Sequence, residues 1–207
     1  MSALAKQIAL VTGATRGIGA AIAAELKAQG ATVIGTATSQ AGADSITAAG
    51  VQGVVLNVTD GAAVDALIDS IVKEHGGLHI LVNNAGITRD TLAMRMKDEQ
   101  WDEVADTNLK AVFRVSRAAI KPMMKQRQGR IINITSVVGA AGNPGQANYA
   151  AAKAGVAGMT RALAQPWHHR QLHRPWFYCH RYDGGIARSA KSCTTGQNSR
   201  RAFGSSG

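Results

Sequence analysis

Short apolar runs alternate along this chain with longer stretches in which apolar residues recur every three or four positions. The runs predict five β-strands, at Ile8–Val11, Thr32–Gly35, Gly53–Val58, Leu78–Val82 and Arg130–Thr135. Helical spacing follows four of them, to about Gln29, over Ala62–His75, from about Lys97 and around Tyr149. Strands that alternate with helices indicate βαβ units. We therefore predict an α/β fold with a Rossmann-like, doubly wound parallel sheet.

The turn after the first predicted strand is rich in glycine. Residues 12–19 read TGATRGIG and place their glycines in the spacing GxxxGxG. Glycine lets the backbone approach a pyrophosphate closely, and the amino end of the following helix attracts its negative charge. A glycine turn with a purely structural role is the alternative. The order of strand, glycine turn and helix favours dinucleotide binding.

The residues after the second strand indicate which dinucleotide binds. An NAD site places a carboxylate near this point, where it binds the ribose 2′-hydroxyl. The segment Thr36–Ser39 contains no carboxylate. Arg16 in the glycine turn offers a guanidinium that can bind a 2′-phosphate through two hydrogen bonds. The sequence therefore favours NADP(H).

The candidate chemistry lies around Tyr149 and Lys153, which are four residues apart and share one face of the predicted helix. An ammonium group beside a phenol stabilises the phenolate. We therefore expect Lys153 to lower the pKa of Tyr149 and make it a proton donor near neutral pH. Ser136 follows the fifth strand, at the edge where open α/β sheets bind ligands. For the tyrosine and lysine alone, simple packing of Tyr149 is the alternative.

Asn108 lies in the interior of a predicted helix. Asparagine is a mediocre helix former because its side chain competes for backbone hydrogen bonds. A buried Asn108 therefore predicts a helix kink or a bound water.

Several motifs together resemble the short-chain dehydrogenase/reductase family. They are TGATRGIG at 12–19, NNAG at 83–86, Asn108, Ser136 and YAAAK at 149–153. Three further segments resemble the 3-oxoacyl-[acyl-carrier-protein] reductases of that family: VIGTATS at 33–39, GITRDTLAMRMKDEQW at 86–101 and GNPGQANYAAAKAG at 142–155. The resemblance runs from about Lys6 to Gln165.

The resemblance implies NADPH-dependent reduction of 3-oxoacyl-[acyl-carrier-protein] to the 3-hydroxyacyl product in fatty acid synthesis. It implies a catalytic tetrad of Asn108, Ser136, Tyr149 and Lys153, in which Ser136 also binds substrate. The cofactor-binding residues that it implies are Gly13, Ala14, Thr15, Arg16, Gly17, Ile18, Gly19, Thr38, Asn57, Val58, Asn84, Tyr149 and Lys153.

The partner implied by the resemblance is the acyl carrier protein, which is acidic in this family. Arg127 and Arg130 form a basic spot beside the fifth strand, and Arg127 matches a docking position of the family. A solvated helix end is the alternative interpretation of these arginines. The resemblance also implies a homotetramer for an intact family member.

The composition changes near Gln165. Residues 166–207 hold seven of the 23 Lys and Arg residues but one of the 13 Asp and Glu residues, and they also hold both cysteines. We divide the chain into an NADP-binding reductase domain, 1–165, and an aberrant basic tail, 166–207. The tail shows no sustained periodicity and is expected to be poorly ordered.

The tail can be decoded with the genetic code. Because Trp has the single codon TGG, reading one nucleotide later across Trp176 and Phe177 forces a glycine. With permitted codons for residues 168–183, that frame reads ITVNCIAPGFIATDMT, which resembles the sixth strand and Pro-Gly loop of the family. We infer a single-nucleotide frameshift near Ala164 to Trp167. The sheet is therefore predicted to end after the fifth strand and its helix, and we expect no stable tetramer.

Other function classes are disfavoured. The tail contains four histidines and two cysteines. Its cysteines form no CxxC pair, and although His169 and His173 have HxxxH spacing, the frameshift accounts for all six residues. Its basic charge permits nonspecific nucleic-acid binding, which we do not favour. No apolar run approaches the length of a membrane span, and the first residues lack the apolar core of a secretory signal. A cytoplasmic protein without metal or nucleic acid is expected.

Overall fold

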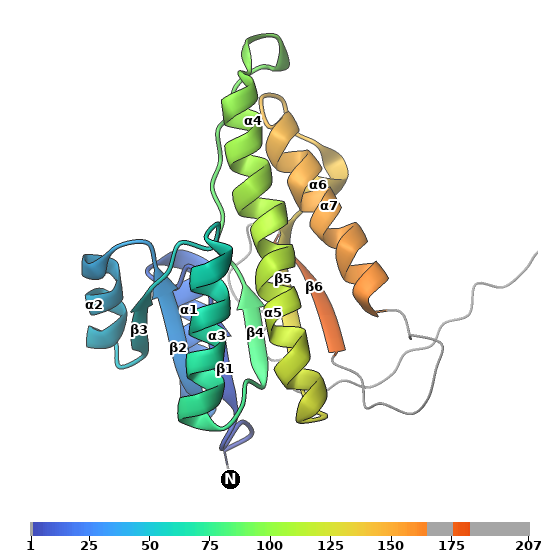
Figure 1. The fold of residues 1–207 in the computed structure, drawn as a ribbon. Coiled ribbons are helices and arrows are strands. Elements are labelled where there is room, and N and C mark those ends of the chain that lie inside the picture. The colour runs from blue at the N-terminus through green and yellow to red at the C-terminus, as the bar shows by residue number, and fades with distance from the viewer. Residues whose placement is uncertain (1, 165–175, 183–207) are drawn as a thin grey trace, which may run out of the picture.

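A parallel β-sheet forms the centre of the molecule in the computed structural model, which describes residues 2–164 and 176–182. Its six strands lie in the order β3-β2-β1-β4-β5-β6, and all neighbouring pairs are parallel (Figure 1). The strands are β1 (Ile8–Val11), β2 (Thr32–Ala37), β3 (Gln52–Val55), β4 (Ile80–Asn83), β5 (Arg130–Ser136) and β6 (Trp176–Tyr182). The strand order reverses between β1 and β4, as expected of a doubly wound sheet.

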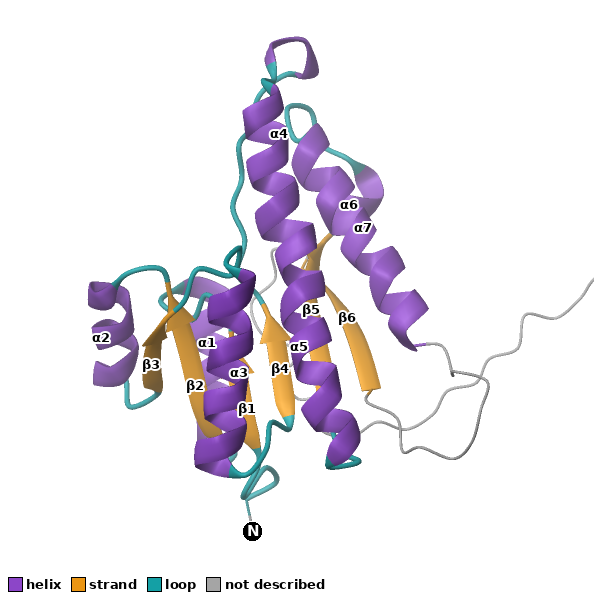
Figure 2. Ribbon diagram, in the orientation of Figure 1, coloured by secondary structure: helices purple, strands orange, loops and turns teal. Residues whose placement is uncertain are grey.

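Helices connect the strands and cover the sheet (Figure 2). They are α1 (Gly17–Ala28), α2 (Gln40–Ala48), α3 (Gly61–His75), α4 (Asp98–Ala105), α5 (Ala111–Lys125), α6 (Val138–Ala141) and α7 (Ala147–Ala164). A short 3₁₀ turn, η1 (Ala93–Arg95), precedes α4, and a π-helical segment, η2 (Asp106–Lys110), joins α4 to α5.

Two apolar clusters lie on opposite faces of the sheet. One packs Leu10 and Leu81 against α3 and α5, and the other packs Val11 and Val82 against α1 and α2. Successive residues of β1 and β4 are all buried because both faces are covered. This explains why the strands appear in the sequence as continuous apolar runs.

A buried polar network also crosses the face that carries α5 and α7. The Asn83 amide donates to the Ser116 hydroxyl at 3.0 Å and to Asn133 Oδ1 at 2.8 Å, and Asn133 Nδ2 donates to Thr160 Oγ1 at 2.9 Å. These bonds tie the carboxyl end of β4 and the middle of β5 to both helices. Because the groups are buried and paired, the network fixes the frame on which the site is built.

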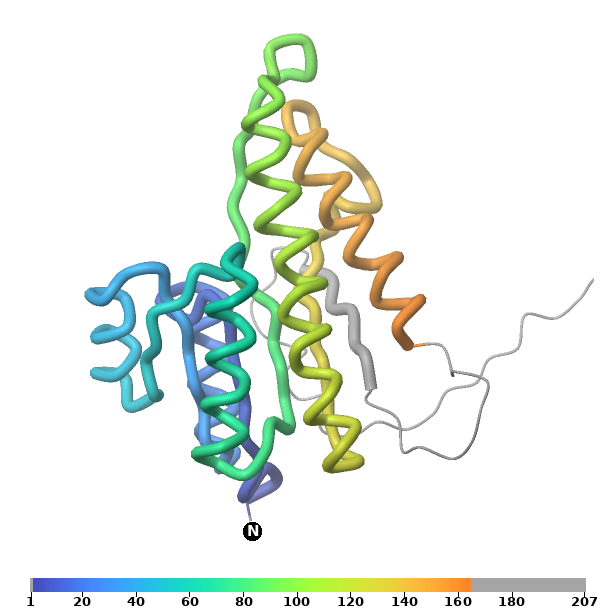
Figure 3. Tube along the Cα trace, in the orientation of Figure 1, coloured from blue at the N-terminus to red at the C-terminus, as the bar shows by residue number. Residues whose placement is uncertain are grey.

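The structure confirms the predicted α/β fold with its parallel sheet, and it differs from the sequence-based prediction at one edge. That prediction ended the sheet after its fifth strand, whereas β6 pairs with β5 in register from Arg130↔Trp176 to Ser136↔Tyr182. Residues 176–182 are rich in aromatic residues, which favour strands, and the outer edge of β5 would otherwise leave its backbone groups unpaired. These two features explain why a further strand pairs there. The rest of the tail, including most of the inferred frameshifted segment, lies outside the described residues (Figure 3).

Candidate active site

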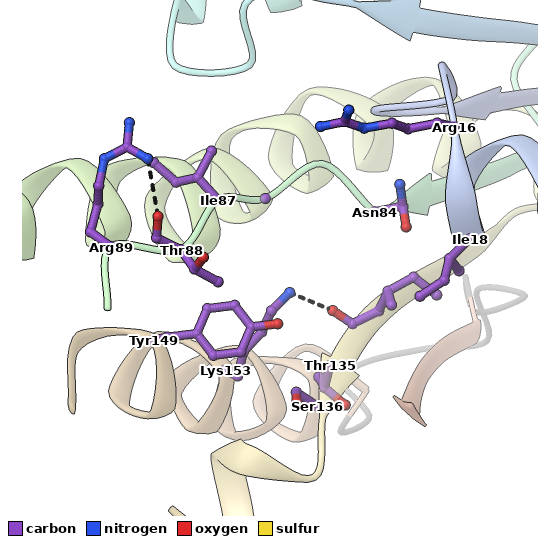
Figure 4. Close-up of a pocket in the computed structure, with 12 residues that line it drawn as sticks. Arg16, Ile18, Asn84, Ile87, Thr88, Arg89, Thr135, Ser136, Tyr149 and Lys153 are labelled. Carbon is purple, nitrogen blue, oxygen red and sulfur yellow. Dashed lines mark hydrogen bonds between the residues drawn. The ribbon is translucent and has the colours of Figure 1, made fainter. Parts of the chain in front are cut away.

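A pocket of about 440 Å³ opens at the carboxyl ends of β1, β4 and β5. This volume lies within the range of ligand sites in proteins. The pocket is lined by Arg16, Ile18, Asn84, Gly86, Ile87, Thr88, Arg89, Ile134, Thr135, Ser136, Tyr149 and Lys153. Arg16 and Asn84 lie across it from Tyr149 and Ser136 (Figure 4). The fold therefore joins the glycine turn and three of the four predicted catalytic residues, Ser136, Tyr149 and Lys153, in one cavity.

The glycine turn packs tightly against its neighbours. Gly13 has a φ of +65°, which favours glycine, and its N–H donates to Thr36 Oγ1 at 3.3 Å. A Cβ on Gly19 would collide with the Gly13 carbonyl and with the Asn84 amide. Asn84 Nδ2 donates to the carbonyls of Thr12 and Gly13 at 3.1 and 2.9 Å. Asn84 thus fixes the turn from the neighbouring strand.

The amino end of α1 has the form of an anion site. The N-cap residue Arg16 makes no side-chain hydrogen bond to the first turn. Gly17 has a φ of +58°, and a Cβ placed on it would meet no atom within 4 Å. The first-turn N–H groups and the positive helix end favour a phosphate at such a place. The residues present therefore fit the pyrophosphate of a dinucleotide.

The remaining predicted cofactor residues lie at the same edge of the sheet. Thr38 follows β2, and Asn57 and Val58 follow β3. Both strands lie on the side of β1 away from β4, with β2 next to β1 and β3 beyond it. None of the three lines the pocket, so their contact with a cofactor stays a prediction.

Tyr149 and Lys153 project from one face of α7 toward the end of β5. The ammonium of Lys153 lies 5.6 Å from the centroid of the Tyr149 ring, and it donates to the carbonyl oxygen of Ile134 at 2.8 Å (Figure 4). Ser136, the last residue of β5, hydrogen-bonds to Tyr149 through its side chain. Its Oγ also accepts from Val138 N–H at 3.2 Å, which orients it toward the pocket. Three of the four predicted catalytic residues thus meet here.

The prediction that the pKa of Tyr149 is lowered is wrong. Burial raises the pKa of Tyr149 above its usual value, the hydrogen bond with Ser136 lowers it, and the charge of Asp90 raises it. Desolvation outweighs the other contributions because the phenolate loses hydration in the pocket. The neutral phenol is therefore the form present at neutral pH.

Asn108 stands apart from the other three. It is fully buried in η2, and its side chain does not line the pocket. Its Oδ1 accepts from Ile87 N–H at 2.8 Å, and its Nδ2 donates to the Ile87 carbonyl at 2.7 Å. The sequence predicted a kink or a bound water at a buried Asn108; the structure shows a buried Asn108 in a π-helical segment, a feature common at functional sites. Asn108 thus holds the pocket wall at Ile87.

The sequence analysis assigned no role to the segment Ile87–Arg89, although it lines the pocket. The guanidinium of Arg89 forms two hydrogen bonds with Glu103, at 2.8 and 2.7 Å. This anchors the segment to α4. The sequence offered one clue to its role. The segment follows the carboxyl end of the strand that ends at Asn83, and open α/β sheets bind ligands at such ends.

The two predicted docking arginines lie near the amino end of β5, whereas the pocket opens at its carboxyl end. Arg130 begins β5, whereas Ser136 ends it, so roughly 20 Å separates them at about 3.3 Å per residue. Arg130 Nη1 donates to the Gly129 carbonyl at 2.8 Å, and partial burial lowers its pKa. Arg127 is exposed with a φ of +57°. Their role in docking stays a prediction.

Neither a metal centre nor a membrane span is found within the part of the chain that the structure describes. No group of three or more His, Cys, Asp or Glu side chains there could hold a metal ion. None of the described helices has the length and apolar character that a membrane crossing needs. The histidine and cysteine side chains of the tail lie outside this description.

Comparison with known proteins relates the chain to oxidoreductases. A family model described as short chain dehydrogenase matches residues 7–173. The 3-oxoacyl-[acyl-carrier-protein] reductase FabG of Escherichia coli K12 is 59% identical over 162 residues, which make up 77% of this chain and 66% of that protein. The proteins of the same name from Haemophilus influenzae and Pseudomonas aeruginosa are 58% and 56% identical over 163 and 165 residues, and each match covers 77% of this chain and 67% of the relative. The chain spans about two thirds of the length of these relatives.

Proposed function

The chain belongs to the short-chain dehydrogenase family, and we propose that its site is built to reduce 3-oxoacyl-[acyl-carrier-protein] with NADPH. The observation that carries this proposal is the meeting of Tyr149, Ser136 and Lys153 with the glycine turn in one pocket. The identity to reductases of that name supports the choice of substrate.

The residues of the glycine turn fit a dinucleotide. The open space over Gly17 and the N–H groups of the first turn of α1 accept a pyrophosphate. The guanidinium of Arg16 lines the same pocket and supplies a bidentate partner for a 2′-phosphate. When bound, the nicotinamide supplies the hydride for the keto carbon.

Proton transfer falls to Tyr149. Because its phenol stays neutral at neutral pH, its hydroxyl can give a proton to the substrate oxygen as the hydride arrives at the carbon. Ser136 hydrogen-bonds to Tyr149 and can also donate to the same substrate oxygen. The Lys153 ammonium, held by the Ile134 carbonyl, stabilises the phenolate that is left.

The names of the relatives support an acyl carrier protein as partner, whereas the assembly is only what the family resemblance implies. Arg127 and Arg130 supply positive charge for an acidic carrier protein. Arg130 lies at the amino end of β5 and Ser136 at its carboxyl end, so a carrier docked at the arginines would sit away from the pocket of the same subunit. A homotetramer belongs to the intact parent. We do not expect this chain to form one, because its sequence after Gln165 departs from the family pattern.

Nucleotide binding without turnover is the second candidate function. It is favoured by the sequence after Gln165, which yields the Pro-Gly loop of the family only in the shifted reading frame. In the frame as written the chain lacks the loop expected to cover the nicotinamide. Without it, water is less well excluded and the hydride donor is held less firmly.

One experiment distinguishes the two candidate functions, reduction and nucleotide binding without turnover. We expect the 207-residue chain to bind NADPH but not to consume it with a 3-oxoacyl thioester. A frame-restored chain, which encodes ITVNCIAPG from position 168, is expected to consume NADPH and form the 3-hydroxyacyl product. NADPH binding is followed by its fluorescence and turnover by its absorbance. Equal turnover of the two chains contradicts the second candidate, and the lack of turnover in both contradicts the first.

A further inference from the structure

The loop that joins β3 to α3 lies at the carboxyl edge of the sheet. It spans residues 56–60 and is here called the β3 loop. Leu56 N–H donates to the Ala37 carbonyl at 2.8 Å, so the loop begins beside the end of β2. It ends at Asp60, the N-cap residue of α3. The β3 loop carries Asn57 and Val58, two of the residues that are predicted to contact the cofactor.

Thr59 in the β3 loop is hydrogen-bonded through its N–H, its hydroxyl and its carbonyl. The N–H and the hydroxyl both donate to Asn57 Oδ1, at 3.1 and 2.9 Å. The carbonyl accepts from Arg114 Nη1 at 2.7 Å. The bonds to Asn57 set the shape of the loop, whereas the bond from Arg114 sets where the loop lies relative to α5.

The Arg114 guanidinium is itself held in place. Its Nη1 lies 3.4 Å from Asp106 Oδ1, and Lys110 Nζ lies 3.1 Å from the same oxygen. The Arg114 side chain is 23% exposed. Partly exposed ion pairs of this kind contribute little to stability, but a planar guanidinium bound on one side presents its N–H groups in fixed directions. Arg114 therefore gives the β3 loop a rigid support.

The order of the strands indicates which half of a dinucleotide would reach the β3 loop. In the proposed function, the pyrophosphate binds at the glycine turn after β1, and the nicotinamide lies beside Ser136 at the end of β5. In the sheet, β5 lies on one side of β1, and β2 and β3 lie on the other. The adenosine half then extends over the ends of β2 and β3, where ligands of open α/β sheets bind.

We propose that Arg114 is a positioning residue for the cofactor: by holding the Thr59 carbonyl, it keeps the β3 loop in place against the adenosine half of NADPH. Arg114 does not line the pocket, so it acts through the loop. Asn57 and Val58 directly precede Thr59, so a shift of Thr59 displaces both. This inference rests on the proposed function, which makes the cofactor a dinucleotide.

The test measures nucleotide affinity in the 207-residue chain, so it does not depend on turnover. Arg114→Met removes the guanidinium and keeps an unbranched side chain, whereas Arg114→Lys keeps the charge on a single ammonium group. Arg117→Met is the matched control, because Arg117 is exposed on the same helix and its guanidinium lies 5.6 Å from the centroid of the Phe113 ring. NADPH fluorescence measures binding of the whole cofactor, and competition by adenosine 2′,5′-bisphosphate measures binding of the adenosine half.

We expect Arg114→Met to weaken the binding of NADPH and of adenosine 2′,5′-bisphosphate by the same factor, about threefold to tenfold, which is the effect of one hydrogen bond. Arg114→Lys is expected to lose less, and Arg117→Met to lose nothing. At saturation, the emission maximum of bound NADPH reports the surroundings of the nicotinamide. It is expected to be the same in all four chains, because the β3 loop lies at the other end of the cofactor.

Unchanged affinities in Arg114→Met overturn the inference, as does an equal loss in Arg117→Met or a shifted emission maximum. Circular dichroism checks the fold of each variant. If Arg114→Met does not fold, Arg114→Lys decides, and affinities equal to those of the unmutated chain then overturn the inference. If the unmutated chain binds neither nucleotide, the proposed dinucleotide site itself is overturned.

Discussion

The glycine turn and the catalytic residues lie at the same edge of the sheet, but they are held in different ways. On the nucleotide side, the bonds that hold the turn have a backbone group at one end, as where the Asn84 side chain donates to the carbonyls of Thr12 and Gly13. On the catalytic side, side chains from segments far apart in sequence also bind one another, as where Gln146 binds Asp90.

This difference decides what can be changed without loss. The glycine turn depends on the lack of a side chain at Gly19, where an added Cβ would collide with the Gly13 carbonyl. A side-chain network depends on the identity of each partner, so it fails when one partner is replaced. The two sides of the pocket should therefore respond separately to mutation, and the predictions below test that separation.

Arg16→Ala should give the largest effect on the nucleotide side. A hydrogen bond to a charged group contributes about 1.5–3 kcal/mol, so NADPH affinity is expected to fall about 10- to 150-fold. NADH lacks the 2′-phosphate, and its affinity is expected to change little. Fluorescence titration of both nucleotides into the 207-residue chain measures this, and an equal loss for both shows that Arg16 does not bind the phosphate.

Gly19→Ala should have a smaller effect, seen in stability. Its Cβ would collide with the Gly13 carbonyl, and overpacking of this kind costs about 1–3 kcal/mol. Gly61→Ala is the matched control, since a Cβ there meets only Arg114 Cδ at 4.0 Å. That change is expected to leave stability unchanged or raise it by up to about 1 kcal/mol. Urea denaturation measures both, and equal effects contradict the tight packing of the turn.

The two sides also differ in how far the sequence predicted them. The strand Ile8–Val11, the glycine turn and the helix after it were predicted closely, because glycine spacing and local periodicity specify them. The third strand ends at Val55 rather than Val58. Leu56 and Val58 are buried without belonging to the strand, so the apolar run overstated its length.

The catalytic side was predicted in its residues but not in its environment. Tyr149, Lys153 and Ser136 meet as expected, yet burial reverses the expected direction of the pKa shift of Tyr149. Desolvation depends on everything that packs around a residue, which one helix face does not reveal. The bonds of Asn108 to Ile87 and of Gln146 to Asp90 likewise join distant segments. The pairing of β6 with β5 was missed because the tail shows no periodicity.

The most direct test of the separation between the two sides is Tyr149→Phe in the frame-restored chain. The change removes the proton donor and keeps the ring, and general acid catalysis contributes about 10²–10⁴ to the rate. Turnover of the 3-oxoacyl thioester is expected to fall by that factor. NADPH affinity is expected to stay within about tenfold, because at most one neutral hydrogen bond is lost. Full turnover in Tyr149→Phe, or a loss of NADPH affinity as large as the loss of turnover, would contradict the account.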